Sequence, residues 1–336
     1  MPNTKYGLVA IGNALVDVLA HASDEFIKAQ DKKHGMKKGT MTLINQNRAV
    51  QLYGEMGAGV EVSGGSAGNT IACYASLGGK GAYIGKVAGD QLGEVFAHDM
   101  RAMGVHYDTV PLAFGAPTGR CMILVTPDGQ RTMNTCLGAA VELHPDDIDE
   151  ELISNTAVTY LEGYLFDPPH AKEAFIKSAE IAHKAGRKVA LTLSDPFCVD
   201  RHREDFKDLV DGHVDILFAN EEEIKSLYEV FEWDQVPAIL DQKCEIACLT
   251  RSEQGSVILN GDDIYDIPAK AVEEVVDTTG AGDAYAAGFL YGYTNGYALD
   301  LNMCGKIGAI AAAEVISHMG PRPEKTLADL LPKKAA

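Results

Sequence analysis

The stretch of this chain best suited to chemistry is Asp277-Thr-Thr-Gly-Ala-Gly-Asp283, which leads directly into an alanine-rich segment. That segment predicts a helix with Asp283 in its first turn. The first amides of a helix lack intrahelical partners and lie at the positive end of its dipole, and the glycines let an anion approach them. A carboxylate there would repel a resting phosphate. A carboxylate at this position is explained if Asp283 takes a proton from a hydroxyl while the amides stabilise charge that develops on a phosphate. This combination is typical of phosphoryl transfer to an alcohol.

A simpler interpretation of Asp283 stays open at this point. An acidic residue in the first turn of a helix also stabilises that helix by complementing its dipole, without any catalytic role. Short glycine-rich motifs occur by chance often enough that the local pattern favours neither interpretation. The rest of the chain must decide between them.

A second glycine-rich turn, Gly64-Gly65-Ser66-Ala67-Gly68-Asn69, enters another segment of small residues. Its glycines let the backbone lie against a polyhydroxylated ligand, and the Asn69 amide can donate and accept at once, which suits a sugar hydroxyl. The turn is not the Gly-x-x-x-x-Gly-Lys-Ser/Thr phosphate loop, because the lysine is absent.

Asn13 and Asp17 are further candidates for binding hydroxyl groups. Asn13 follows a short apolar strand over 6–12, and Asp17 is embedded in an apolar run. A charge in such a run needs a partner or a function, and the carboxyl ends of strands in an open α/β sheet are where ligands bind. The alternative, which the residue types alone favour, is a turn asparagine and a solvent-facing edge-strand aspartate.

Strands and helices that alternate along the second half of the chain would position these residues. The predicted strands are 157–162, 188–193, 214–219 and 245–250, and the predicted helices are 145–154, 169–185, 201–210, 221–230, 234–241 and 301–318. This order predicts a largely parallel sheet with helices on both faces. Asn220 and Glu223 follow one strand and face the same way, although acidic residues at a helix start can also serve only the dipole.

The pattern changes between 105 and 137. Segments 105–110, 119–126 and 131–137 read as strands without intervening helices, and 40–44 reads as another. We therefore expect a β-rich lid formed by 16–44 and 109–137. A large α/β catalytic domain would comprise 1–15, 45–108 and 138–330, and the tail from Gly320 onward would be frayed.

The composition of the chain limits the classes of molecule that it is expected to bind. The chain has 336 residues and a formal charge of −19, which argues against nucleic acid and anionic membranes as partners. Its seven cysteines are scattered and odd in number, as expected for reduced thiols in a cytoplasmic protein. The N-terminal apolar run is too short for a signal peptide, and no uncharged stretch approaches the ~20 residues of a membrane span. We expect a monomer or a homodimer.

Over nearly its whole length the chain resembles the ribokinase-like (PfkB) carbohydrate and nucleoside kinases. The motif at 277–283 is similar to the C-terminal motif of that family, the turn at 64–69 to its N-terminal one, and Asn220 to Glu223 to its Asn-x-x-Glu motif. The segments at 12–17, 191–197 and 214–221 resemble the adenosine kinases within the family. The implied fold is a three-layer αβα arrangement around a mostly parallel sheet of about eight or nine strands, with a β-rich lid.

The resemblance also implies roles for individual residues. Asp283 would be the base on the sugar 5′-hydroxyl, the amides of Gly280, Ala281 and Gly282 the anion hole, and Arg131 on the lid a stabiliser of charge. The residues implied at the ribose are Asn13, Asp17, Gly64, Gly65, Ser66 and Asn69. Those implied at the purine are Leu15, Cys121, Leu137, Ala139 and Phe197. Those implied along ATP are Asn220, Glu223, Thr250, Gly255, Asp277 and Thr278, with Glu223 acting on Mg²⁺ through water.

The expected activity is ATP-dependent, Mg²⁺-assisted phosphorylation of the adenosine 5′-hydroxyl in purine salvage, with K⁺ as a further candidate cofactor. Another nucleoside or sugar kinase of the same family is the alternative within this enzyme class. A non-catalytic ligand-binding relative is an alternative of another class, against which the intact Asp283 and its glycines argue. A dinucleotide-dependent oxidoreductase is disfavoured because no Gly-x-Gly-x-x-Gly follows the first strand.

Overall fold

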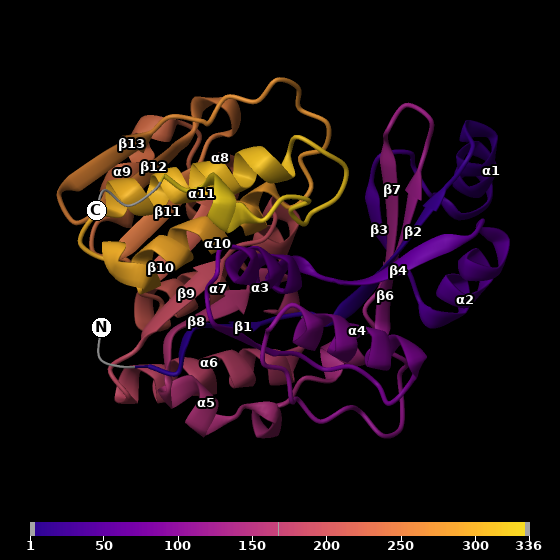
Figure 1. Cartoon of the computed structure of the whole chain (residues 1–336), viewed down its shortest axis with the longest axis horizontal. Helices are drawn as coiled ribbons and strands as arrows, with labels where there is room; N and C mark the ends of the chain where they lie inside the picture. Colours follow the sequence, from indigo (N-terminus) through magenta and orange to yellow (C-terminus); the bar gives the residue numbers. More distant parts are fainter. Residues whose placement is uncertain (1–3, 167, 333–336) are drawn as a thin grey trace.

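An eight-stranded sheet forms the centre of the larger part of the molecule (Figure 1). The computed structural model describes residues 4–166 and 168–332. In spatial order the strands are β13 (Asp263–Ile267), β12 (Ser256–Asn260), β11 (Ile246–Thr250), β10 (Ile216–Asn220), β9 (Lys188–Thr192), β8 (Thr156–Glu162), β1 (Tyr6–Ile11) and β5 (Gly81–Ile84). The six from β11 to β5 are parallel, and β12 and β13 are antiparallel to their neighbours.

Helices cover both faces of this sheet, because side chains along each buried strand alternate between two cores. In β1, Leu8 and Ala10 belong to one core, and Val9 and Ile11 to the other. The first core is covered by α3 (Ser66–Ser76), α4 (Gln91–Ala102), α10 (Ala281–Gly292) and α11 (Leu301–Val315). The second is covered by α5 (Glu150–Ser154), α6 (Pro169–Lys184), α7 (Pro196–His213), α8 (Glu221–Tyr228) and α9 (Val236–Leu240). The predicted three-layer fold class is confirmed.

A smaller sheet stands beside the large domain (Figure 1). Its strands, in spatial order, are β3 (Met41–Leu43), β7 (Arg131–Cys136), β6 (Gly119–Val125), β2 (Leu15–His21) and β4 (Gly59–Gly64). Helices α1 (Asp24–His34) and α2 (Gln46–Glu55) pack on its outer face against Val18, Ala20 and Met122. Asp17 alternates with these residues and so lies on the other face, which is turned toward the large domain.

The structure departs from the predicted boundary of this smaller unit. Residues 45–64 were expected in the large domain, yet β4 pairs antiparallel with β2, and α2 buries Ala49 and Leu52 in the core of the small sheet. The six residues of 59–64 alternate too weakly in polarity to reveal which sheet they join, since a strand finds its partner through tertiary pairing. The small sheet is thus formed by 15–64 together with 119–136.

Three local predictions also need correction. Segment 105–110 forms only an isolated bridge from His106 to Ala82, because Tyr107 packs in an aromatic cluster with Tyr83 and Phe96. The expected helix at 145–154 is a 3₁₀ turn followed by the short α5. The antiparallel strands β12 and β13 were not predicted.

Two further expectations concern the whole chain. All seven cysteines are free thiols. Across the described part of the chain, no helix combines the length and the apolar character that crossing a bilayer requires.

Candidate active site

Asp283 lies in the first turn of α10, as predicted, at the carboxyl-end rim of the large sheet. Gly280 caps this helix with φ +78°, and a Cβ there would lie 2.7 Å from Pro321, so both its conformation and its surroundings require glycine. The Asp283 carboxylate accepts hydrogen bonds from the Ser66 hydroxyl (2.6 Å) and the Asn69 amide (3.3 Å). The two glycine-rich turns, more than 200 residues apart in sequence, therefore meet at this carboxylate.

Burial raises the pKa of Asp283 to about 6, while the bonds from Ser66 and Asn69 and the charge of Arg322 act in the opposite direction. Arg322 comes from the segment after α11. Its Nε donates to Asn69 Oδ1 (3.2 Å) and its Nη1 to the Ser63 hydroxyl (2.8 Å). The guanidinium thereby fixes the Asn69 amide with its NH₂ group toward Asp283. The expectation of a frayed tail from Gly320 is wrong for this segment.

Asn13 lies just beyond β1 and is held by a buried glutamate. Glu162 Oε1 accepts from the Asn13 side-chain amide (2.8 Å) and backbone N–H (3.3 Å), and Glu162 Oε2 accepts from the Ala67 N–H (2.8 Å). Asn13 Oδ1 is buried and has no hydrogen-bond partner within the described residues. An orphaned buried acceptor of this kind calls for a donor from outside the protein.

Asp17 presents a second acceptor of the same kind. Its carboxylate is buried on the inner face of β2 and makes no hydrogen bond or close ion pair within 4–166 and 168–332. A Cβ on Gly64 would meet this carboxylate at 2.4 Å, and a Cβ on Gly65, whose φ is +84°, would meet the Asn13 carbonyl at 2.3 Å. Burial raises the pKa of Asp17 to about 6, with Arg322 and Arg131 lowering it.

The proposed anion hole is only partly free. The Ala281 N–H donates to the Thr278 carbonyl (3.2 Å). In the described chain no partner is found for the Gly280 and Gly282 amides, and a Cβ at Gly282 would meet no atom within 4 Å. A compact anion can therefore reach two of the three predicted amides. Thr278 is exposed beside them.

Asp277 was predicted to contact ATP, but its carboxylate is already occupied. Oδ1 accepts from the N–H and the hydroxyl of Thr279, and Oδ2 accepts from the Gly320 N–H and pairs with Arg131. Asp277 therefore shapes the motif and anchors neighbouring segments to it. Arg131, predicted on the lid, is brought to the motif by this pair.

Asn220 and Glu223 form a reciprocal capping box at the start of α8. Glu223 is buried, and burial raises its pKa to about 7, with Asp195 and Asp283 adding to the rise against the bond from the Asn220 N–H. A buried carboxylate without a cationic partner in the described chain fits a cation held through water. No group of three His, Cys, Asp or Glu in those residues is arranged to bind a metal directly.

Thr250 and Gly255, the other two residues predicted along ATP, differ from each other in their surroundings. Thr250 lies beside Asn220 at the same height of the sheet. Gly255 packs against the backbone of β13, where a Cβ would lie 2.1 Å from the Ile267 carbonyl oxygen, so the structure gives this glycine a packing role.

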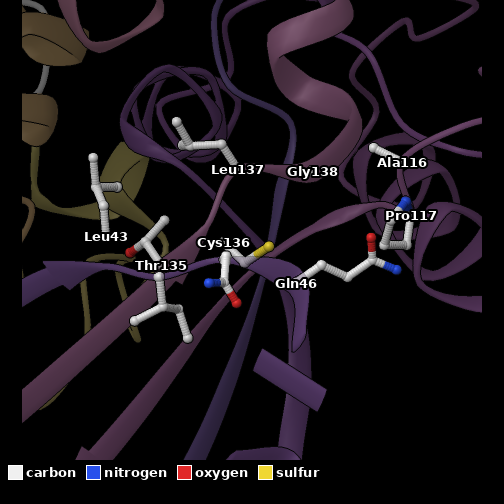
Figure 2. Close-up of a pocket in the computed structure, with 10 residues that line it drawn as sticks. Leu43, Gln46, Ala116, Pro117, Thr135, Cys136, Leu137 and Gly138 are labelled. Carbon is white, nitrogen blue, oxygen red and sulfur yellow. The ribbon is translucent and has the colours of Figure 1, made fainter. Parts of the chain in front are cut away.

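The five predicted purine residues differ in how far they are exposed to a ligand. Leu15 and Cys121 are buried beside Asp17 on the inner face of the small sheet, and Phe197 stands on the rim of the large sheet, 75% exposed. Ala139 has no exposed surface and therefore does not border a base. Leu137 lines a cavity of about 300 Å³, together with Leu43, Gln46, Ala116, Pro117 and Thr135 (Figure 2). The Thr135 hydroxyl donates to Cys121 Sγ (3.2 Å), so this cavity adjoins the inner face of the small sheet.

Glu162 and Arg322 are the site residues that the sequence analysis missed. Glu162 ends a fully buried strand at the ligand rim, and a charge at the end of an apolar strand was a usable signal. Arg322 carried no comparable signal, since its segment has neither periodicity nor a motif.

Comparisons with known proteins place the chain among kinases. A model of the pfkB family of carbohydrate kinases matches residues 8–327. The solved structure of adenosine kinase from Sinorhizobium meliloti is 52% identical, with a TM-score of 0.88, and covers 97% of this chain and 98% of that one. A probable sugar kinase from Rhizobium etli is 50% identical over the same shares, with a TM-score of 0.89. Adenosine kinase of Saccharomyces cerevisiae is 26% identical and covers 94% of this chain and 96% of the yeast protein.

Proposed function

We propose that this chain, which belongs to the pfkB family of carbohydrate kinases and is a phosphotransferase with an alcohol acceptor, phosphorylates the 5′-hydroxyl of adenosine with ATP. The observation that carries the proposal is the position of Asp283. Its carboxylate stands in the first turn of α10, beside unpaired amides and near two acceptors without a protein donor in the described chain, Asn13 Oδ1 and Asp17. A base, an anion site and a clamp for hydroxyls are what transfer to a ribose requires.

In the proposed reaction Asp283 accepts the proton of the 5′-hydroxyl as that oxygen bonds to the γ-phosphorus, and ADP departs. The raised pKa of Asp283 makes it a stronger base than an exposed aspartate while leaving it ionised at neutral pH. The amides of Gly280 and Gly282 hold charge that develops on the phosphoryl oxygens. Glu223, with Asn220, would hold Mg²⁺ through water, and the ion would neutralise charge on the phosphates when bound.

Adenosine is favoured over a free sugar by the apolar side chains beside the clamp. Leu15 lies two residues from Asp17 on the same face of β2, and Cys121 pairs with Asp17 across the sheet. These groups can cover a purine, whereas a free sugar would need polar partners around its anomeric carbon. The similarity to adenosine kinases supports the same choice, and the similarity to a probable sugar kinase makes sugars the main competitors.

The test is a coupled assay of ADP release with adenosine, inosine, guanosine, ribose and fructose as acceptors. We expect kcat/KM for adenosine to exceed that for each other acceptor by at least tenfold. A preference for ribose or fructose would overturn the assignment to adenosine but leave the phosphotransferase intact. Omission of Mg²⁺ should abolish turnover, and replacing Na⁺ with K⁺ tests whether the enzyme uses K⁺.

A further inference from the structure

Glu162 is a buried acid that the proposed reaction does not use directly. Its carboxylate ends β8, is 1% exposed, and faces no cationic group within hydrogen-bond distance in the described chain. Three N–H donors converge on it, two from Asn13 and one from Ala67. A Cβ on Gly12 would lie 2.2 Å from Glu162 Oε2, so the neighbouring backbone is shaped around this side chain. Burying a carboxylate is costly, and such an arrangement needs a reason beyond packing.

The hydrogen bonds of Glu162 determine which way the Asn13 amide points. Each Glu162 oxygen accepts a backbone N–H group, and the ionised side chain can only accept, so the NH₂ group of Asn13 faces Glu162 and the Oδ1 atom faces away. Oδ1 is the atom left buried without a partner. Leaving it so is costly unless a ligand supplies a donor. Glu162 therefore converts a side chain that could donate or accept into one that only accepts.

The same side of the turn carries Asp17, which is also a pure acceptor when ionised. Gly64 lies against the Asp17 carboxylate and Gly65 against the backbone carbonyl of Asn13, so the two residues that carry these acceptors flank one turn of backbone. Within 4–166 and 168–332, Asn13 Oδ1 has no protein donor, and Asp17 interacts with Arg322 and Arg131 only through their charge. A ligand bound there must bring two donors at adjacent positions, as a pair of neighbouring hydroxyl groups does.

We propose that Glu162 is a positioning residue for the acceptor substrate: by holding the Asn13 amide in one orientation, it makes the site select a vicinal diol over analogues that lack one hydroxyl. The inference rests on the proposed function for the choice of adenosine as ligand, but it applies to any acceptor of the enzyme that carries such a diol. Glu162 acts through Asn13 and does not touch the reacting atoms.

Glu162→Gln tests this directly, because glutamine keeps the size of the side chain and changes one acceptor oxygen into an NH₂ group. If that group faces Asn13, the amide of Asn13 turns over and presents its own NH₂ group to the ligand. We expect the adenosine KM to rise about tenfold or more while kcat stays within about threefold. The ratio of kcat/KM between adenosine and at least one of 2′-deoxyadenosine and 3′-deoxyadenosine should shrink about fivefold.

A double-mutant cycle separates positioning from structural support. In an Asn13→Ala background, Glu162→Gln should change the adenosine KM less than about twofold, because the amide it orients is gone. A cost of similar size in both backgrounds would overturn the proposal. So would a fall in kcat with an unchanged KM, which would indicate that the bond to Ala67 at the start of α3 is what matters.

Asp215→Asn is the matched control. This carboxylate accepts the Val189 N–H (2.8 Å) and pairs with Lys188 (3.1 Å) at the opposite end of the sheet, so its loss tests destabilisation away from the site. It should leave KM and the deoxy ratios unchanged. The panel of acceptor substrates is tested first on the wild-type enzyme. If the enzyme prefers another diol, the proposal of adenosine as substrate fails. The double-mutant cycle is then run with that acceptor and its monodeoxy analogues, and it still decides the role of Glu162.

Discussion

Arg131 of the small sheet and Asp277 of the large domain form an ion pair across the two units, with Nε 3.0 Å from Oδ2. Their side chains are only 6% and 10% exposed. Asp277 also accepts hydrogen bonds from Thr279 and Gly320. The first residue of the glycine-rich motif therefore connects the small sheet, the start of α10 and the C-terminal segment. Removing one partner of such a buried ion pair strongly destabilises the folded protein, because the other charge stays buried without compensation.

Arg131→Met should loosen the small sheet from the large domain. The substitution leaves the Asp277 charge without its partner and removes a contact that holds the small sheet to the large domain. In the protein without ligands, backbone amides at 119–136 should therefore exchange with solvent several-fold faster. Arg120→Met is the control, because Arg120 stacks on Tyr53 within the small unit instead. Equal exchange in the Arg131 variant and the wild type would mean that the ion pair does not tether the sheet. Adenosine, which contacts both units in our proposal, should slow the same amides, and an ATP analogue alone should not.

Asp283→Asn should lower kcat by roughly 10²–10⁴ with little change in nucleoside affinity, because a base contributes to the transition state and little to binding. The two quantities are measured by turnover and by calorimetry. In the wild type, kcat should rise with pH through about 6 and level off above it, since Asp283 must be ionised to accept the proton. An Asp283→Asn variant with near-normal kcat would leave this residue with only its role at the helix terminus.

Sequence patterns predicted the parts of this site that depend on local structure. Asp283 falls in the first turn of α10 because glycines and then alanines dictate a turn and a helix. Asn220 and Glu223 cap α8 reciprocally because residues three apart face each other there. In both cases the spacing along the chain sets the geometry.

The parts that sequence could not predict depend on distant packing. Arg322 reaches Asn69 only because the segment after α11 folds back beside α3. Strand β4 carries no local signal for either sheet, and its pairing with β2 alone assigns it to the small one. The bond from Glu162 to Asn13 requires β8 to lie next to β1, which follows from the sheet order and not from the strand itself.

Arg322→Met should shift the rise of kcat with pH, which lies near pH 6 in the wild type, to higher pH. The guanidinium favours the ionised form of Asp283, so its removal raises the pKa of that carboxyl and lowers the ionised fraction near pH 6. Arg322→Lys keeps the charge but cannot pair with Asn69 and Ser63 in the same way. If the lysine variant has the wild-type pH dependence of kcat, the effect is due to the charge of Arg322. If the methionine variant also keeps the wild-type pH dependence, the predicted effect of Arg322 on the pKa of Asp283 is refuted.

Glu223→Gln should raise the Mg²⁺ concentration needed for half-maximal activity by roughly 10–100-fold, the usual cost of losing a group that orients a metal or its waters. Glutamine can still accept the Asn220 N–H and so retains the capping box, but it loses the second bond, from the Asn220 side-chain amide. Adenosine affinity, measured by calorimetry without nucleotide, should not change. Glu222→Gln removes an exposed charge from the same helical turn and should leave the Mg²⁺ dependence as it is. If both variants shift that dependence equally, the acidic turn attracts Mg²⁺ only through its overall field, and Glu223 has no specific place in holding the ion.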